Sequence, residues 1–144
     1  EAFSVPVAFA IYYLGFAILV LPNAASLGLS DFVGIGIFAL GCYLNTASEW
    51  QRHIFKSDPA NKGKLYTGGL FGLSMHINFF GDVLWVLGYA MIANHLIGYA
   101  LPILLLIFFA FFNVPKLDTY LRERYGQPFK DYEAKTKRLV PFVW

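Results

Sequence analysis

Four apolar runs follow one another in this sequence, and each has about the length that crosses a lipid bilayer. They cover residues 3–21, 32–48, 77–93 and 96–114. A membrane-spanning helix needs about 20 predominantly apolar residues, because the hydrocarbon core is about 30 Å thick. Backbone polar groups in lipid must bond within their own segment, which favours helices. The pattern therefore predicts one all-α integral membrane domain over residues 1–144, with about four transmembrane helices and a tail, residues 115–144, in water.

The composition excludes several other classes of protein. Apolar residues make up 58% of the chain and charged residues only 14%, against roughly 45–50% and about 25% in soluble domains. These values exclude an intrinsically disordered chain. A net charge of +2 is too small to hold a nucleic acid, and the single cysteine, Cys42, cannot form an internal disulfide. Three scattered histidines without a Glu-x-x-His pair predict no metal site.

The charged residues indicate how the chain lies in the membrane. All eleven Lys and Arg residues fall between residues 52 and 64 or between residues 116 and 138. Basic loops remain on the cytosolic side of a membrane, so we expect this loop and the tail on that side (stroma or matrix in an organelle). In the tail, Tyr125, Phe129 and Tyr132 recur at helical spacing. They predict an amphipathic tail whose apolar edge lies against the bundle.

Two pairs of polar residues interrupt the apolar pattern. Asn45 and Glu49 are four residues apart, as are Asn78 and Asp82, so each pair shares one helix face. Both pairs fall near the end that carries the basic loop, and polar groups at such depth usually face a cavity or a partner. Cations of that loop would complete a pocket: Arg52, Lys56 and Lys64. Cations for phosphates, with carboxylates and amides for ribose and base edges, suit a nucleotide.

Each of these residues also has a structural interpretation, which the sequence leaves open. Glu49 could be an interfacial charge beside Arg52. Asp82 could be a carboxylate near a helix N-terminus that backbone N–H groups satisfy. His76, standing alone, is more typical of a hydrogen-bonded core histidine than of a ligand.

Several blocks of the sequence resemble a known family. They are residues 45–56, the block Gly68-Gly69-Leu70-Phe71, the block Ile77-Asn78-Phe79-Phe80-Gly81-Asp82, and residues 132–144. As a set they resemble the C-terminal half of the steroid 5α-reductase-like family, and within it the branch described as a domain of unknown function. Sterol reductases and isoprenylcysteine methyltransferases are more distant relatives.

The resemblance implies a binding site for NADPH that is reached from the cytosolic side. The positions that match the cofactor-binding residues of the family are Asn45, Glu49, Arg52, Lys56, Asn78, Asp82 and Tyr125, with Lys64 and Phe71 as looser candidates. The sequence departs from the family at Met75 and Ile77, where many relatives have an Arg-His-Pro motif around the histidine. It also has Leu121 where a tail histidine is expected. The catalytic groups of the family lie in earlier spans, so we expect them upstream of residue 1.

The leading hypothesis is an NADPH-dependent reductase that acts on a C=C bond of a steroid, polyprenoid or enoyl lipid. One alternative is a catalytically inactive accessory subunit, packed against partner membrane subunits in a respiratory or photosynthetic complex. A less favoured one is a methyltransferase that uses S-adenosylmethionine. The sequence does not distinguish a membrane of the endoplasmic reticulum from one of a plastid or mitochondrion. It implies that the protein contacts the lipid bilayer, together with either a lipid substrate or partner membrane subunits.

Overall fold

The computed structural model describes residues 12–18 and 26–144, and within them the regular structure is entirely helical. Residues 12–18 are helical, and the elements that follow are α2 (Leu29–Ser57), η2 (Pro59–Asn61), η3 (Gly69–Gly72), α3 (Ile77–Ala93), η4 (Leu96–Tyr99), α4 (Ala100–Phe108), η5 (Phe109–Asn113), α5 (Val114–Tyr125) and α6 (Gln127–Glu133). The four elements from η4 to α5 follow one another without a break, so they form one long helix over Leu96–Tyr125.

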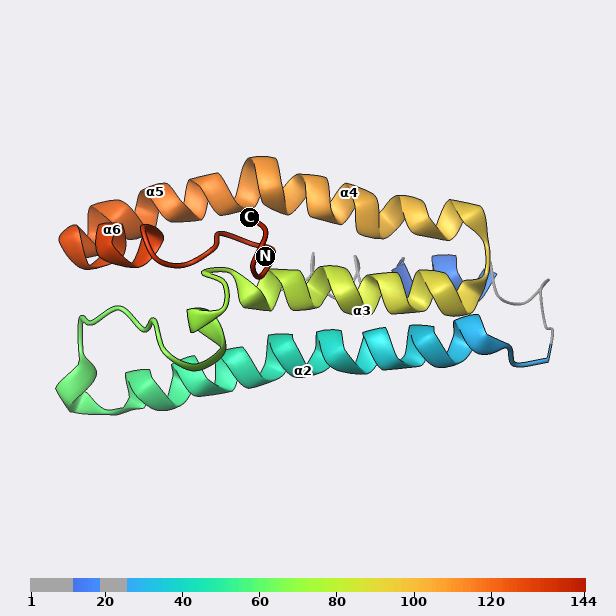
Figure 1. Ribbon diagram of the computed structural model, residues 1–144, viewed down its shortest axis with the longest axis horizontal. Coiled ribbons are helices and arrows are strands. Elements are labelled where there is room, and N and C mark those ends of the chain that lie inside the picture. Colours follow the sequence, from blue (N-terminus) through green and yellow to red (C-terminus); the bar gives the residue numbers. More distant parts are fainter. Residues whose placement is uncertain (1–11, 19–25) are drawn as a thin grey trace.

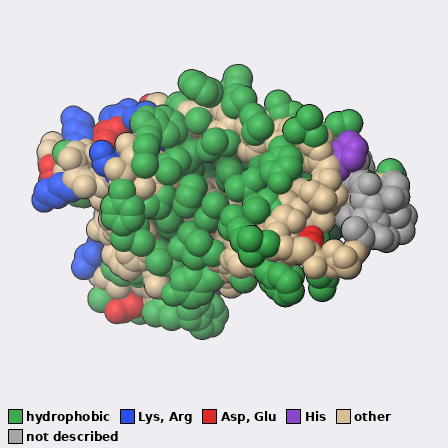
Figure 2. Space-filling view, turned by 45° about the vertical axis from the view of Figure 1, so that its right-hand side comes forward, with side chains coloured by type: hydrophobic (Ala, Val, Ile, Leu, Met, Phe, Trp, Pro, Cys, Tyr) green, Lys and Arg blue, Asp and Glu red, His purple; other side chains and the backbone are tan. Residues whose placement is uncertain are grey.

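The three long helices lie side by side and alternate in direction: α2, then α3, then the helix that contains α4 and α5 (Figure 1). The loop between α2 and α3 therefore lies at the same end as α6 and the C-terminal segment. Backbone hydrogen bonds join them, from Met75 N to Lys137 O (2.8 Å) and from His76 N to Arg138 O (3.1 Å). We call this the basic end, because both Lys- and Arg-containing segments of the sequence, 52–64 and 116–138, lie there. Figure 2 shows the Lys and Arg side chains gathered at one end and mainly hydrophobic side chains over the rest of the visible described face.

Two of the described helices are long and apolar enough to cross a membrane, Leu29–Ser57 and Leu96–Tyr125. Helix α3 is apolar but has only 17 residues, or about 26 Å at 1.5 Å per residue. The predicted run 77–93 coincides with α3, whereas the helices at 32–48 and 96–114 extend further than predicted, into polar sequence. Of the predicted span 3–21, residues 12–18 are helical and the rest lies outside the described residues. Four membrane spans stay a prediction.

Helices α2 and α3 pack through glycines at matched positions. Gly34 and Gly41 on α2 are seven residues apart, as are Gly81 and Gly88 on α3. A Cβ atom added at Gly41 would lie 2.6 Å from the Gly81 carbonyl oxygen, and one at Gly88 would lie 2.7 Å from that of Gly34. Small residues let the backbones of neighbouring membrane helices approach closely. This glycine seam sets the distance between α2 and α3, on which the polar residues beside it depend.

The long last helix changes its hydrogen-bond pattern at its centre. Pro115 has no N–H group to donate to the carbonyl one turn earlier, and just before it η5 forms a π-helical turn in which Val114 N donates to Phe109 O. Beyond this turn, α5 buries Val114 and Asp118, which are four residues apart on one face. Phe109 stacks on Phe79 of α3, with ring centroids 4.7 Å apart. The middle of the helix therefore packs against the start of α3 through Phe109.

Candidate functional site

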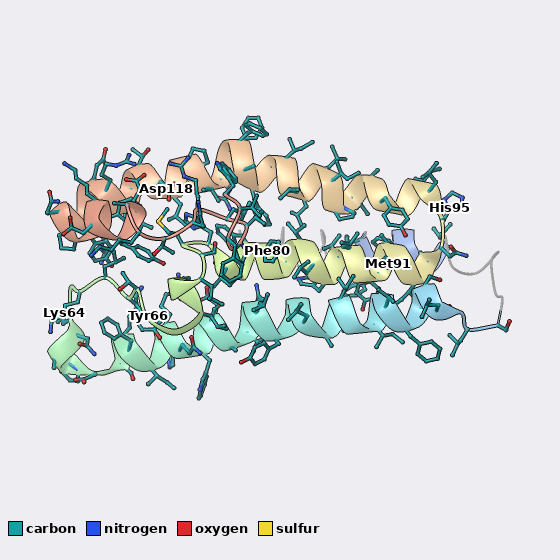
Figure 3. All side chains as sticks on the ribbon, viewed as in Figure 1. Lys64, Tyr66, Phe80, Met91, His95 and Asp118 are labelled. Carbon is teal, nitrogen blue, oxygen red and sulfur yellow. The ribbon has the colours of Figure 1, made fainter. Side chains whose placement is uncertain are left out.

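A pocket of about 300 Å³ opens at the basic end. Its walls come from the end of α2, the α2–α3 loop, the start of α3, α5 and α6. The polar and aromatic residues that line it are Arg52, Lys56, Tyr66, Phe71, His76, Asn78, Phe79, Tyr125 and Tyr132. Figure 3 shows Tyr66 in the loop and Asp118 on α5 at this end of the molecule, with His95 at the opposite end. Segments far apart in the sequence thus build one cavity beside the cationic surface.

Four of the seven predicted cofactor-binding residues line this pocket: Arg52, Lys56, Asn78 and Tyr125. The other three, Asn45, Glu49 and Asp82, belong to a hydrogen-bonded network between α2 and α3. Lys64 lies in the loop and is not among the lining residues, whereas Phe71 is. Whether any of them binds a cofactor stays a prediction.

The network begins with the side chain of Asn45 on α2. Its Nδ2 atom donates to Asp82 Oδ1 (2.8 Å) and to the Asn78 carbonyl oxygen (3.2 Å) on α3. Trp85 Nε1 also donates to Asp82 Oδ1, at 2.9 Å. Side chains therefore hold this carboxylate, and the alternative in which backbone N–H groups near the helix N-terminus satisfy it is wrong.

The network continues through Glu49 to the pocket. Asn78 Nδ2 donates to Glu49 Oε1 (2.9 Å), and the Arg52 guanidinium forms an ion pair with the other carboxylate oxygen. The same guanidinium lies over the Phe71 ring, 5.6 Å from its centroid. Glu49 thus neutralises part of the charge of Arg52 and orients it, which leaves the exposed Lys56 as a cation at the pocket rim.

The C-terminal tail closes the pocket from the other side. Phe129 and Tyr132 are buried in one cluster with Met75, and Leu65, Leu121 and Tyr125 pack against it. The apolar edge predicted for the tail therefore faces the bundle. The Tyr132 hydroxyl donates to the carbonyl oxygen of Phe71 at 2.6 Å. Burial, and secondarily the charge of Asp118, raise the pKa of Tyr132 above its ordinary value, so its hydroxyl stays protonated and continues to donate.

A buried charged cluster lies beside the pocket: His76 is a hydrogen-bonded core histidine, as the sequence predicted, but its partners were not anticipated. His76 and Asp118 are each 2% exposed, and His76 Nε2 lies 2.7 Å from Asp118 Oδ1. Arg138 Nε lies 3.0 Å from the second carboxylate oxygen of Asp118. Arg138 also approaches Glu133 (3.4 Å), which pairs with Arg122 (2.7 Å). Asp118 shares a helix face with Val114 and Leu121. An acidic residue on that otherwise apolar face is the sequence signal that could have revealed the cluster.

The comparisons with known proteins agree with the resemblance found in the sequence. The family model described as DUF1295, protein of unknown function, matches residues 3–136. The probable O-methyltransferase ustE of Ustilaginoidea virens is 40% identical over 93 residues, which are 63% of this chain and 32% of that protein. The Delta(14)-sterol reductase erg24 of Schizosaccharomyces pombe is 28% identical over 122 residues, 73% of this chain and 28% of that protein. The 3-oxo-5-alpha-steroid 4-dehydrogenase 2 of Homo sapiens is 26% identical over 112 residues, 78% of this chain and 42% of that protein.

These matches cover most of this chain but only part of each relative. The chain spans about a third of the length of the first two relatives. The names of the relatives include both reductases and an O-methyltransferase, so the comparisons support a reductase-like or methyltransferase family and leave its substrate and cofactor open.

Proposed function

The chain belongs to the DUF1295 family, and we propose that its pocket binds NADPH for the reduction of a carbon–carbon double bond in a lipid. The observation that carries the proposal is the pocket itself: two cations, an amide and several aromatic rings converge at the basic end of bilayer-length helices. NADPH supplies the hydride when it is bound. The protein residues bind and orient the cofactor and keep water from it.

The donor set of the pocket suits a phosphorylated nucleotide. Guanidinium and ammonium groups are the usual partners of phosphate oxygens, and Arg52 and Lys56 lie on the same helix, one turn apart. Asn78 and Tyr125 can bond to ribose hydroxyls or base edges, and Tyr66 offers a ring for stacking. A volume of about 300 Å³ lies at the lower end of the range for small-molecule sites. We propose that the pocket holds the phosphate-bearing part of the cofactor.

The proposed substrate is a lipid because of what surrounds the pocket. Large hydrophobic side chains are exposed along α2 and α4, among them Leu40, Tyr43, Ile103 and Leu104, and such faces suit the interior of a bilayer. A lipid substrate would then enter from the bilayer, while the cofactor would enter from the basic end.

A second candidate, methyl transfer from S-adenosylmethionine, is supported by the relative named as a probable O-methyltransferase, which is 40% identical over 93 residues. The charge of the pocket argues against it. S-adenosylmethionine has a sulfonium and an ammonium group and only one carboxylate, whereas NADPH has several negative charges on its phosphates. A pocket with Arg52 and Lys56 in its wall therefore favours NADPH.

Binding experiments on the purified chain in detergent separate these candidates. Titration with NADPH and with S-adenosylmethionine should show binding of NADPH, weakened by Lys56→Ala by about 1.5 kcal/mol, or roughly tenfold. The lower end of the range for charged hydrogen bonds applies because Lys56 is exposed. Lys62→Ala, at an exposed loop lysine outside the pocket, is the matched control and should bind like the wild type.

Each alternative has its own signature in that experiment. Binding of S-adenosylmethionine alone would support the methyltransferase. If wild type binds neither compound, the reductase proposal is wrong and the accessory-subunit alternative is preferred.

A further inference from the structure

The buried pair of His76 and Asp118 touches the pocket. Both residues are 2% exposed, yet His76 belongs to the pocket lining. Its ring stacks in parallel on Phe79, with centroids 5.6 Å apart and planes at 7°. Its backbone N–H is bonded to Arg138 O. The imidazole is therefore held from several sides at the wall of the cavity.

The partners of Asp118 determine which ring nitrogen carries the proton. Asp118 Oδ2 lies 3.0 Å from Arg138 Nε, and a carboxylate paired with a guanidinium acts as an acceptor of hydrogen bonds. His76 Nε2, 2.7 Å from Asp118 Oδ1, must then carry the hydrogen and donate it. In a neutral imidazole the other nitrogen, Nδ1, is an acceptor. Because Nε2 is engaged by Asp118, Nδ1 is the ring nitrogen that remains for a ligand.

We propose that Asp118, held by Arg138, fixes His76 as the Nε2–H tautomer, so that Nδ1 accepts a hydrogen bond from an N–H or O–H group of the molecule in the pocket. Asp118 is a positioning residue in this arrangement, and His76 is a specificity-determining one. The inference rests on the proposed function for its ligand: adenine amino, ribose hydroxyl and carboxamide groups are donors of this kind. It goes further by naming the polar contact that this wall of the pocket makes.

The tautomer can be measured without any ligand. In the purified chain with ¹⁵N-labelled histidine in detergent, side-chain NMR spectra distinguish Nε2–H from Nδ1–H. The signals of His76 are assigned by their loss in His76→Gln, and the exposed His53, whose ring stacks on Trp50, serves as an internal reference. We expect the Nε2–H pattern for wild-type His76, and mixed tautomers in Asp118→Leu. An Nδ1–H pattern in the wild type would overturn the proposal, even if Asp118→Leu fails to fold.

Two substitutions then separate the two nitrogens. Glutamine places a polar atom near the position of Nε2, so His76→Gln can keep the contact to Asp118 while it loses the Nδ1 acceptor. Asparagine places an oxygen near Nδ1, so His76→Asn can keep the acceptor while it loses that contact. We expect His76→Gln to retain thermal stability and to bind NADPH about tenfold more weakly, the scale of one hydrogen bond. His76→Asn should lose stability and a smaller part of its affinity.

Wild-type affinity in His76→Gln would overturn the role of Nδ1, because a purely structural histidine predicts that result. A wild-type chain that binds neither NADPH nor S-adenosylmethionine would overturn the proposed function and the ligand contact with it. The NMR pattern of the free protein decides the positioning role of Asp118 independently.

Discussion

Replacing Gly41 by alanine tests the glycine seam on which the site depends. An added Cβ would lie 2.6 Å from the Gly81 carbonyl oxygen and would also meet the Trp85 backbone nitrogen. Ordinary contacts of carbon atoms are about 3.5 Å or more, so the helices must separate locally by about 1 Å. Both obstacles are backbone atoms of α3, which cannot rotate out of the way.

The expected cost has two parts. Overpacking in a well-packed interior costs about 1–3 kcal/mol. Separation of α2 from α3 also stretches the hydrogen bond from Asn45 to Asp82, now 2.8 Å, and a bond to a charged group contributes about 1.5–3 kcal/mol when it is lost fully. With partial loss of this bond, we expect Gly41→Ala to lower the free energy of unfolding by about 3 kcal/mol.

Unfolding followed by circular dichroism in detergent, with heat or denaturant, measures this effect. The matched control is Gly36→Ala on the same helix, where an added Cβ meets nothing within 4 Å. Alanine is the better helix former by up to about 1 kcal/mol, so the control should be as stable as wild type or more stable. Equal stability of the two variants would refute the close packing of α2 and α3 through these glycines.

Three further predictions concern the basic end and the topology of the helices. Arg138→Gln should destabilise the fold by about 2 kcal/mol. The loss is below the 3–5 kcal/mol of a fully buried pair because the arginine is partly exposed. A titration with denaturant that shows no loss of stability would contradict the ion pair with Asp118. Tyr132→Phe should cost about 1 kcal/mol at neutral pH, since a loop carbonyl loses its donor. Because burial raises the pKa of Tyr132, its contribution is full below the ordinary tyrosine pKa of about 10 and declines above it, which thermal unfolding across pH would reveal. Cysteines at Lys62 and Asn94, in a background without the native cysteine, should react with an impermeant reagent from opposite sides of a membrane, and reaction from the same side would contradict the predicted topology.

The helices were predictable where the sequence changes from polar to apolar abruptly. Residues 77–93 coincide with α3 because polar sequence borders the apolar run on both sides. Helix α2 extends to Ser57, nine residues beyond the predicted 48, and the last long helix reaches Tyr125 rather than 114. An apolar run marks the part of a helix that suits lipid, whereas the helix continues into water wherever its residues favour it.

The polar pairs were predictable as faces of single helices, but their meeting was not. The spacing of Asn45 and Glu49 places both on one side of α2, and that of Asn78 and Asp82 does the same on α3. Their pairing depends on the glycines, whose seven-residue spacing is visible in the sequence. That spacing predicts a close approach of helices only once α2 and α3 are known to be neighbours. The contact of His76 with Asp118 joins residues 42 apart, because the long last helix runs antiparallel to α3, and no local pattern encodes it.

The same seam links the fold to the proposed chemistry. Asn78 both lines the pocket and donates to Glu49 across the interface, so the distance between α2 and α3 sets where its amide lies. Glu49 in turn orients Arg52 through an ion pair. A change of about 1 Å at Gly41, one turn from Asn45, would therefore move hydrogen-bonding groups at the pocket wall, although Gly41 itself does not line it. Directional hydrogen bonds weaken steeply when donor and acceptor are displaced, so Gly41→Ala should also lower NADPH affinity, while Gly36→Ala leaves it unchanged.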